Sequence, residues 1–252
     1  MIRLQSQQLS VEYRSARTRL TSLVLNGLDF SIEAGQFAAI LGPSGCGKTT
    51  LLNVLTGLLP ATHGRVLLDG QEIRGPSRDR AQVFQTPALL PWRTVLENAS
   101  YGLELQGIPA RQAAERAFKF VSLVGLQGFE DRYPHELSTG MQQRVNLARA
   151  LATEPKLLLM DEPLAALDAQ SREQMQDEIQ RAWLQTGTTA LLVTHLISEA
   201  VYLADIILVL TPAPAVVKAL VPVPLPRPRR PDMRQLTEFY ELENRVRKLN
   251  EI

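Results

Sequence analysis

The stretch GPSGCGKT, residues 42 to 49, could hold a chain of phosphates. Its three glycines allow successive backbone N–H groups to curl around an anion. Lys48 can reach the outer two phosphates, and the hydroxyl of Thr49 is placed for Mg²⁺. The alternative is a glycine turn with a chance lysine, but the stretch fits every position of a phosphate-binding loop. The candidate phosphate-contacting residues are Gly42, Pro43, Ser44, Gly45, Cys46, Gly47, Lys48, Thr49 and Thr50.

Two adjacent carboxylates end the apolar stretch LLLMDEP, residues 157 to 163. Successive residues of a strand point to opposite sides, so Asp161 and Glu162 cannot share one task. We expect Asp161 to bind Mg²⁺ and Glu162 to polarise a water that attacks a phosphate. Alone, the two could be ordinary turn or cap residues. A phosphate-binding loop in the same chain favours the catalytic interpretation.

The stretch HELSTGMQQR, residues 135 to 144, has the polar, glycine-bearing start of a helix that could contact an anion. It lacks the lysine and the longer glycine loop that a nucleotide's phosphate chain usually needs. These residues alone therefore leave open whose phosphate they would contact.

Short apolar runs rich in branched residues alternate with longer stretches of helical period, which predicts an α/β fold with a mainly parallel sheet. Helices are expected after residue 47 and at 108–124, and strands at 37–41, 65–69, 81–84, 157–161, 190–193 and 206–210. We expect one domain at 1–211, with a helical lobe at about 86–155 inserted between its strands. The Pro-rich segment 212–231 is then a linker to a short helix at 232–251.

The composition limits the class of protein. The chain has 252 residues, 45% of them hydrophobic, so it can bury a full core. A formal net charge of +1 gives no overall basic field for nucleic acid, and the run RPRR at 227–230 is expected to be a solvated tail. The single Cys46 excludes an internal disulfide. It is either a redox-sensitive thiol or a small residue that a tight loop tolerates.

Membrane-spanning and secreted classes are also disfavoured. No apolar stretch approaches the roughly 18 residues that a membrane helix needs, and the first ten residues do not resemble a signal peptide. We therefore expect a cytosolic protein that meets a membrane only through a partner.

Several motifs occur in the order and approximate spacing found in the ATP-binding cassette (ABC) ATPases. They are the loop at 42–49, Gln85, LSTGMQQR at 137–144, the acidic pair at 161 and 162, ALDAQ at 166–170, and His195. The resemblance covers residues 1 to about 211. It implies a RecA-like P-loop NTPase core with an N-terminal antiparallel β part, and ATP and Mg²⁺ as cofactors.

The resemblance also answers whose phosphate HELSTGMQQR would contact. In this family two cassettes face each other head to tail, which implies a homodimer. Ser138 and Gly140 of one chain then contact the ATP that is held by the phosphate-binding loop of the other.

Single residues receive roles from the same resemblance. Gln85 resembles the glutamine that senses Mg²⁺ and the attacking water, and His195 the switch histidine that contacts the terminal phosphate. Asp168 resembles a residue that communicates across the dimer, and Tyr13 the aromatic residue that stacks on adenine. Without the family, Gln85 and His195 would be ordinary polar residues and Tyr13 a core residue of an early strand. Thr139 departs from the family, which usually has glycine there; a regulatory module with little turnover therefore stays an alternative.

A finer resemblance rests on residues 86–105 and on MDEPLAALDAQSR, which are similar to ATPase subunits of bacterial importers for nitrate, sulfonates such as taurine, and bicarbonate. It implies two transmembrane permease subunits and a periplasmic or extracellular solute-binding protein as partners, at the cytoplasmic face of the inner membrane. Leu89, Leu90, Trp92 and Val95 either line a groove for a helix of the membrane partner or belong to the core of the lobe.

The main alternative is a soluble ABC ATPase that clamps nucleic acid or a ribosome. One cassette, one cysteine and no heptad run favour the importer, for which we expect no nucleic-acid partner. The sequence does not indicate the solute, because the solute never touches such an ATPase.

Overall fold

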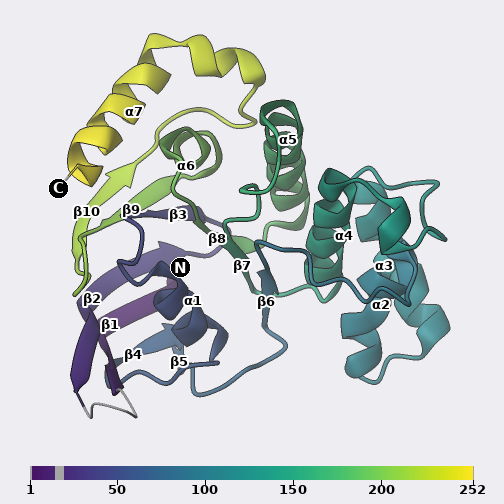
Figure 1. The fold of residues 1–252 in the computed structure, drawn as a ribbon, viewed down its shortest axis with the longest axis horizontal. Coiled ribbons are helices and arrows are strands. Elements are labelled where there is room, and N and C mark those ends of the chain that lie inside the picture. The colour runs from purple at the N-terminus through teal and green to yellow at the C-terminus, as the bar shows by residue number, and fades with distance from the viewer. Residues whose placement is uncertain (1, 15–19, 252) are drawn as a thin grey trace. The chain divides into compact units, whose positions relative to one another are not determined.

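The computed structural model describes residues 2–14 and 20–251, which form two compact units (Figure 1). The first unit comprises Met1–Ser77 and Thr189–Ile252, and the second comprises Arg78–Thr188. The chain therefore leaves the first unit after the fifth strand and returns to it with the eighth.

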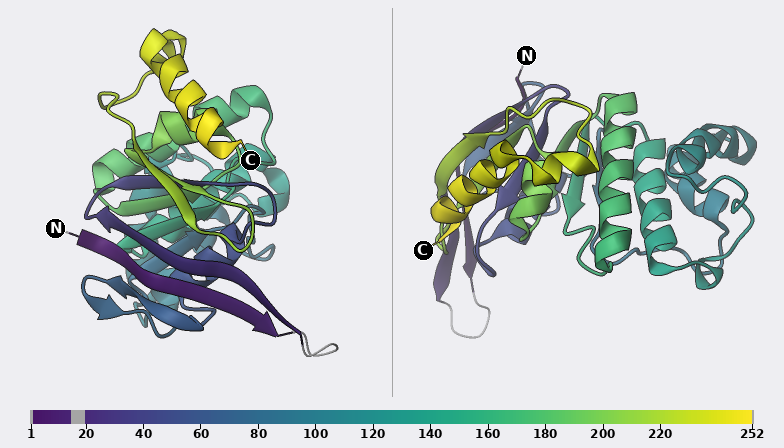
Figure 2. Two further views of the ribbon diagram at one scale, coloured as in Figure 1. Left: turned by 90° about the vertical axis from the view of Figure 1, so that its left-hand side faces the viewer. Right: turned by 90° about the horizontal axis from the view of Figure 1, so that it is seen from above.

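One sheet of the first unit is antiparallel, as the family resemblance implied. Its strand order is β2-β1-β4-β5, with β1 at Ile2–Arg14, β2 at Thr21–Glu33, β4 at His63–Leu68 and β5 at Gln71–Glu72. The two long strands β1 and β2 lie side by side (Figure 2). Leu28, Phe30 and Ile32 of β2 are buried and alternate with exposed residues, as the two-residue period of a strand requires.

The other strands of the first unit include β3, which leads into the phosphate-binding loop. β3 at Phe37–Leu41 pairs in parallel with β8 at Thr189–Val193 and with β9 at Ile206–Leu210. Every residue of β3 and β8 is buried, which explains their uninterrupted apolar sequences. β10 at Val217–Pro222 pairs antiparallel with β9, so the prediction of a linker over 212–231 was wrong for this segment.

The helices of the first unit follow its strands. They are α1 at Lys48–Thr56, α6 at Ile197–Leu203, the 3₁₀ helix η2 at Pro231–Gln235 and α7 at Thr237–Asn250. Gly57 ends α1 in the left-handed conformation. The final helix α7 packs against α6, β9 and β10 (Figure 2), and begins five residues later than predicted, since η2 precedes it.

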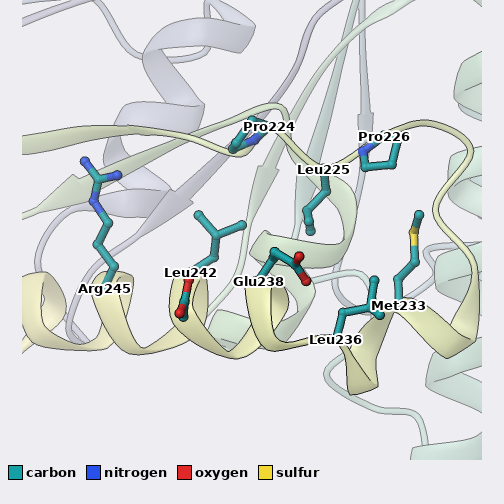
Figure 3. Close-up of a pocket in the computed structure, with 9 residues that line it drawn as sticks. Pro224, Leu225, Pro226, Met233, Leu236, Glu238, Leu242 and Arg245 are labelled. Carbon is teal, nitrogen blue, oxygen red and sulfur yellow. The ribbon is translucent and has the colours of Figure 1, made fainter.

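A groove separates the N-terminal half of α7 from the segment that follows β10 (Figure 3). Leu225 points toward α7 from that segment, and Met233 and Leu242 point back (Figure 3). The C-terminal region is therefore folded onto the first unit.

The second unit combines two parallel strands with helices. β6 at Arg80–Val83 pairs with β7 at Leu157–Asp161. Between these strands lie α2 at Val95–Leu105, α3 at Ala110–Leu123, the 3₁₀ helix η1 at Pro134–Glu136 and α4 at Thr139–Ala152, and α5 at Ala169–Thr186 follows β7. Helices α2, α3 and α4 pack on one another, so the residues between the two strands are mainly helical, as predicted.

Within residues 2–14 and 20–251, no helix combines the length and the apolar character needed to cross a bilayer.

Candidate active site

The phosphate-binding loop connects β3 to α1. Gly45 and Gly47 have φ values of +76° and +110°, which side-chain-bearing residues rarely adopt. A Cβ at Gly47 would stand 2.8 Å from Leu25 Cδ2 and 2.9 Å from Val24 Cγ1, and a Cβ at Gly42 would stand 2.8 Å from Cys46 Sγ. Glycine is therefore required by the backbone angle at both Gly45 and Gly47, and by close packing at Gly42 and Gly47.

The loop leaves the start of α1 available to an anion. Gly47, which has no side chain, occupies the N-cap position of this helix. The first N–H groups of a helix have no partner within the helix, and they favour negative charge. The loop thus fits the phosphate chain of ATP.

Lys48 is folded back onto the loop. Its Nζ donates hydrogen bonds to the carbonyl oxygens of Gly42 at 2.7 Å and Pro43 at 3.0 Å, and the side chain is buried. These bonds hold the ammonium group inside the loop, where a phosphate would meet it. This position suits a charge-assisted contact with a phosphate, which stays a prediction.

Cys46 is a buried part of the loop and not an exposed thiol. Burial raises the pKa of its thiol, although the charge of Lys48 acts in the opposite direction. A buried thiol with a raised pKa is a poor nucleophile, so packing against Gly42 explains this residue better than redox chemistry does.

Tyr13 lies beside α1, the helix that follows the phosphate-binding loop. Its hydroxyl is 3.3 Å from the hydroxyl of Thr50 in α1, and 43% of the residue is exposed. This contact orients the ring while leaving part of its surface accessible, which suits stacking on a base. The exposure argues against a simple core role for Tyr13. Stacking itself stays a prediction.

His195 lies in a turn that is fixed on both sides. The Thr194 hydroxyl donates to the Glu199 carboxylate in α6 and accepts from the N–H of Leu196 at 3.1 Å, and the Thr194 N–H donates to Ile40 O of β3 at 3.3 Å. The imidazole itself is exposed. Thr194 thus fixes the backbone beside the histidine, a role that the sequence did not predict.

The second unit carries the acidic pair. Asp161 is the last residue of β7, and Glu162 follows at φ +42°. A left-handed conformation costs a residue other than glycine about 1 kcal/mol or more. Glu162 O accepts the N–H of Ala165 at 3.1 Å, which stabilises the turn. The strand therefore ends in a turn directly after Asp161, and the different tasks of the two carboxylates stay a prediction.

Mg²⁺ would be held by few protein ligands. Within 2–14 and 20–251 no three His, Cys, Asp or Glu residues come together as a metal cluster. Mg²⁺ usually takes one or two carboxylates together with substrate phosphates and water. Thr49 is exposed in the first unit, and in the second unit Gln85 is exposed and Asp161 is half-buried, so each can offer an oxygen ligand. That they share one Mg²⁺ stays a prediction.

Gln85 follows β6 in a segment that is bonded to α4. Gln143 Nε2 and Asn146 Nδ2 of that helix both donate to Phe84 O at 3.0 Å, and Arg149 Nη1 donates to Ala88 O at 2.6 Å. Gln143 and Asn146 are buried. The backbone on either side of Gln85 is thus fastened to the helix that begins at Ser138.

Ser138 is the N-cap of α4, as its sequence predicts. Its hydroxyl accepts the N–H of Met141 at 3.3 Å and can still donate a proton to another group. Among the described residues, no atom beyond the chain neighbours and the helix's own backbone lies within 4 Å of a Cβ built on Gly140. Packing in this chain therefore does not explain the glycine, whereas close approach of another molecule would.

Thr139 and Asp168 have ordinary local roles. Thr139 is exposed as the first residue of α4. Asp168 caps α5 by accepting from the backbone N–H of Ser171 at 3.0 Å and from its hydroxyl at 2.6 Å. These two hydrogen bonds lower the pKa of the Asp168 carboxyl, so it is charged at neutral pH. Communication across a dimer stays a prediction.

Comparison with known proteins decides the family. A family model described as ABC transporter matches residues 25–165. The chain belongs to the ABC transporter family. It is an ATP-binding cassette ATPase, and the α/β P-loop fold predicted from its motifs is confirmed.

Relatives of this ABC ATPase include proteins from archaea and bacteria. An uncharacterized ABC transporter ATP-binding protein of Methanocaldococcus jannaschii is 49% identical over 88% of this chain and 82% of its own. The taurine import ATP-binding protein TauB of Escherichia coli O157:H7 is 47% identical over 81% of this chain and 80% of its own. A solved dimeric cassette, in a post-hydrolysis state with ADP and Pi, has a TM-score of 0.75 and 28% identity, over 87% of this chain and 98% of that one.

The predicted site residues of the ABC ATPase divide between its units. The phosphate-binding loop, Tyr13 and His195 belong to the first unit. The second unit carries Gln85, Ser138, Gly140, Asp161, Glu162 and Asp168.

The sequence did not predict the side chains that hold the backbone next to Gln85 and His195. Gln143 and Asn146 lie three residues apart on α4, but nothing in the sequence indicates that both donate to Phe84 O. Thr194 precedes His195 directly, but nothing in its sequence context indicates the bond to Glu199. Such positioning residues are found only once their partners are known.

Proposed function

We propose that this ABC ATPase powers an importer for a small anion, such as a sulfonate like taurine, nitrate or bicarbonate. The observation that supports the motor role is that each of two candidate phosphate-contacting segments is incomplete by itself. The phosphate-binding loop lacks a side-chain cap at its helix, and the turn at Ser138 and Gly140 is open to another molecule. A head-to-tail homodimer would complete each site with the other.

The residue roles in this proposal are those that the family resemblance implies. Lys48 and the N–H groups of α1 bind the phosphates of ATP, and Tyr13 stacks on the adenine. Glu162 accepts a proton from the attacking water, His195 contacts the terminal phosphate, and Gln85 orients the water. Mg²⁺, held by Thr49, Gln85 and Asp161, would neutralise charge on the phosphates. Asp168 and the Ser138 turn belong to the dimer contact.

The choice of solute class rests on relatives and not on the site. The taurine import proteins named TauB are 46–48% identical to this chain across several bacteria. We propose that the ATPase lies at the cytoplasmic face of the membrane, bound to two permease subunits that receive solute from an external binding protein.

A pocket in the second unit is the proposed contact with the permease. Phe84, Leu90 and Tyr101 line it together with three arginines, Arg78, Arg80 and Arg149. Apolar side chains next to arginines suit a short helix that carries acidic residues. Phe84 lines the pocket and directly precedes Gln85, so a helix bound there would contact the segment that is hydrogen-bonded to α4.

The four apolar residues predicted for this groove differ in their surroundings. Leu90 lines the pocket, and Trp92 is 70% exposed. Leu89 is partly exposed. Val95 is only 1% exposed as the first residue of α2, so its assignment to the groove was wrong and the core alternative holds for it.

Replacing Leu90 with glutamate should uncouple the ATPase from its permease. An unpaired carboxylate in an apolar contact costs several kcal/mol. The variant should lose co-purification with the permease pair, while ATP hydrolysis by the isolated ATPase stays within about twofold of wild type. Leu105→Glu is the matched control, because Leu105 ends α2 and is 71% exposed. Aggregation of the Leu90 variant alone would show that Leu90 is core.

Reconstitution tests the proposed function as a whole. The ATPase, its co-purified permease pair and the binding protein are placed in liposomes, and ATP hydrolysis is measured with taurine, nitrate or bicarbonate outside. We expect one of these anions to stimulate hydrolysis and to be accumulated. Stimulation by RNA or ribosomes, with none of the anions active, would support the clamp alternative instead.

A further inference from the structure

The basic run at 227–230 is not a solvated tail, and the prediction made from its charge was wrong. Arg229 is only 2% exposed. Its Nη1 donates to Val201 O at 2.8 Å and to Ala204 O at 2.7 Å, and its Nη2 donates to Val223 O at 3.2 Å. The carbonyl groups at the end of α6 have no partners within the helix, which is why they can receive a guanidinium group.

Arg227 reinforces this contact. Its Nη2 donates to Leu203 O at 2.5 Å and to Asp205 Oδ1 at 2.8 Å. Asp205 Oδ2 in turn accepts the N–H of Phe37 at 2.9 Å. Phe37 begins β3, the strand that leads into the phosphate-binding loop. The two arginines thus join the end of α6 to the base of that strand.

Residues of the same C-terminal segment also contact Tyr202 of α6. The hydroxyl of the fully buried Tyr202 donates to Arg229 O at 3.1 Å, and the guanidinium carbon of Arg234 lies 3.8 Å from the centre of the Tyr202 ring. Burial lowers the pKa of the Arg229 guanidinium to about 9, and the charge of Arg227 adds to the shift. The ion remains the main form at neutral pH, held by the carbonyl groups around it.

The other end of α6 adjoins His195. This helix has only seven residues and no side-chain hydrogen bond at its N-cap, so tertiary contacts must fix its position. At its start the contact is the Thr194–Glu199 hydrogen bond, and at its end the contacts are Arg227 and Arg229. A shift of α6 would therefore move the turn that carries the histidine.

We propose that Arg229, assisted by Arg227, is a positioning residue for His195, acting through α6. The C-terminal segment fixes the end of this helix, and the helix fixes the histidine turn at its start. The inference rests on the role proposed above for His195 in hydrolysis. It assigns to residues 223–236 a part in turnover that the ATPase motifs do not include.

Histidine NMR signals can test this coupling directly. The chain has three histidines, His63, His135 and His195, so the imidazole signals can be assigned by replacing each in turn. Arg229→Gln should shift the His195 signals and leave those of His63 and His135 in place. Arg230→Gln is the control, because Arg230 is a neighbour with a 69% exposed side chain that pairs with Asp232. It should shift none of the three.

Turnover should follow the same pattern. We expect kcat of Arg229→Gln to fall roughly 3- to 30-fold, with the affinity for ATP unchanged and with partial rescue in Arg229→Lys. Arg230→Gln should hydrolyse ATP like the wild type. If Arg229→Gln does not fold, Arg227→Gln takes its place with the same measurements, since Arg227 is less deeply buried.

Unmoved His195 signals in a folded variant would overturn the proposal, as would equal shifts in Arg229→Gln and Arg230→Gln. Shifted signals with normal turnover would also overturn it, provided that His195→Ala slows hydrolysis. Normal turnover in His195→Ala would instead remove the proposed role of the histidine. This result can be distinguished from a failure of the Arg229 proposal, because Arg229→Gln shifts the His195 signals whether or not His195 takes part in hydrolysis.

Discussion

The Glu162→Gln variant is expected to bind MgATP like the wild type while its hydrolysis falls roughly 10²- to 10⁴-fold, the usual contribution of a general base. The amide keeps the shape of the side chain but cannot accept a proton from water. The backbone at φ +42° and the Ala165 hydrogen bond to Glu162 O do not depend on the carboxylate. Because hydrolysis is what separates the proposed dimer, the variant should elute as a dimer when MgATP is present.

Glu154→Gln provides a control with the same change of side chain. Glu154 also has a left-handed backbone, at φ +49°, and is exposed after α4. Its replacement should alter neither hydrolysis nor elution. A Glu162→Gln chain that stays monomeric with MgATP, or turns over at the normal rate, would remove Glu162 from its role.

Lys48→Ala is expected to weaken MgATP binding roughly 10- to 150-fold, the equivalent of 1.5 to 3 kcal/mol for a hydrogen bond to a charged group. The ammonium group is the only side-chain charge in the phosphate-binding loop. Its loss also leaves Gly42 O and Pro43 O without the donor that now holds the loop together. Calorimetric titration with MgATP measures the affinity, and thermal unfolding shows whether the fold survives.

An alanine at Lys119 removes the same charge from an exposed position on α3. This control should bind MgATP like the wild type. Equal affinity in a folded Lys48→Ala chain would place the nucleotide elsewhere than residues 42–50.

Local patterns were enough to predict the parts of the fold that depend on neighbours in sequence. Strands 37–41, 157–161 and 206–210 have the predicted bounds, because each is a buried apolar run with a turn at its end. The helix start at Ser138 was also predictable, because a polar, glycine-bearing stretch marks it locally. β10 was missed because Pro222 and its neighbouring prolines suggested a linker. An edge strand accepts proline, since one of its sides lacks a partner strand.

Features that depend on distant partners were not predictable. The charge of the run at 227–230 suggested solvent exposure. Arg229 is nevertheless buried, because it donates hydrogen bonds to carbonyl groups at the end of α6, and no sequence pattern indicates this contact. The same limit applies to Gln143 and Asn146, whose shared acceptor Phe84 O lies about 60 residues earlier in the chain. Their functional relevance emerged only from geometry.

The central claim is that each ATP is hydrolysed between two copies of this chain, and mixed dimers test it most directly. Differently tagged chains are combined in two arrangements, and both hydrolysis and retained labelled nucleotide are measured. In the first, Lys48→Ala lies in one chain and Ser138→Arg in the other. In the second, one chain carries both changes and its partner is wild type.

If the loop of one chain works with the Ser138 turn of the other, the first arrangement keeps one whole site and the second keeps none. The first should therefore retain more nucleotide and hydrolyse faster. If the turn serves the loop of its own chain, the order is reversed, because the wild-type chain of the second arrangement keeps an intact site. Higher activity and retention in the second arrangement would contradict the shared site.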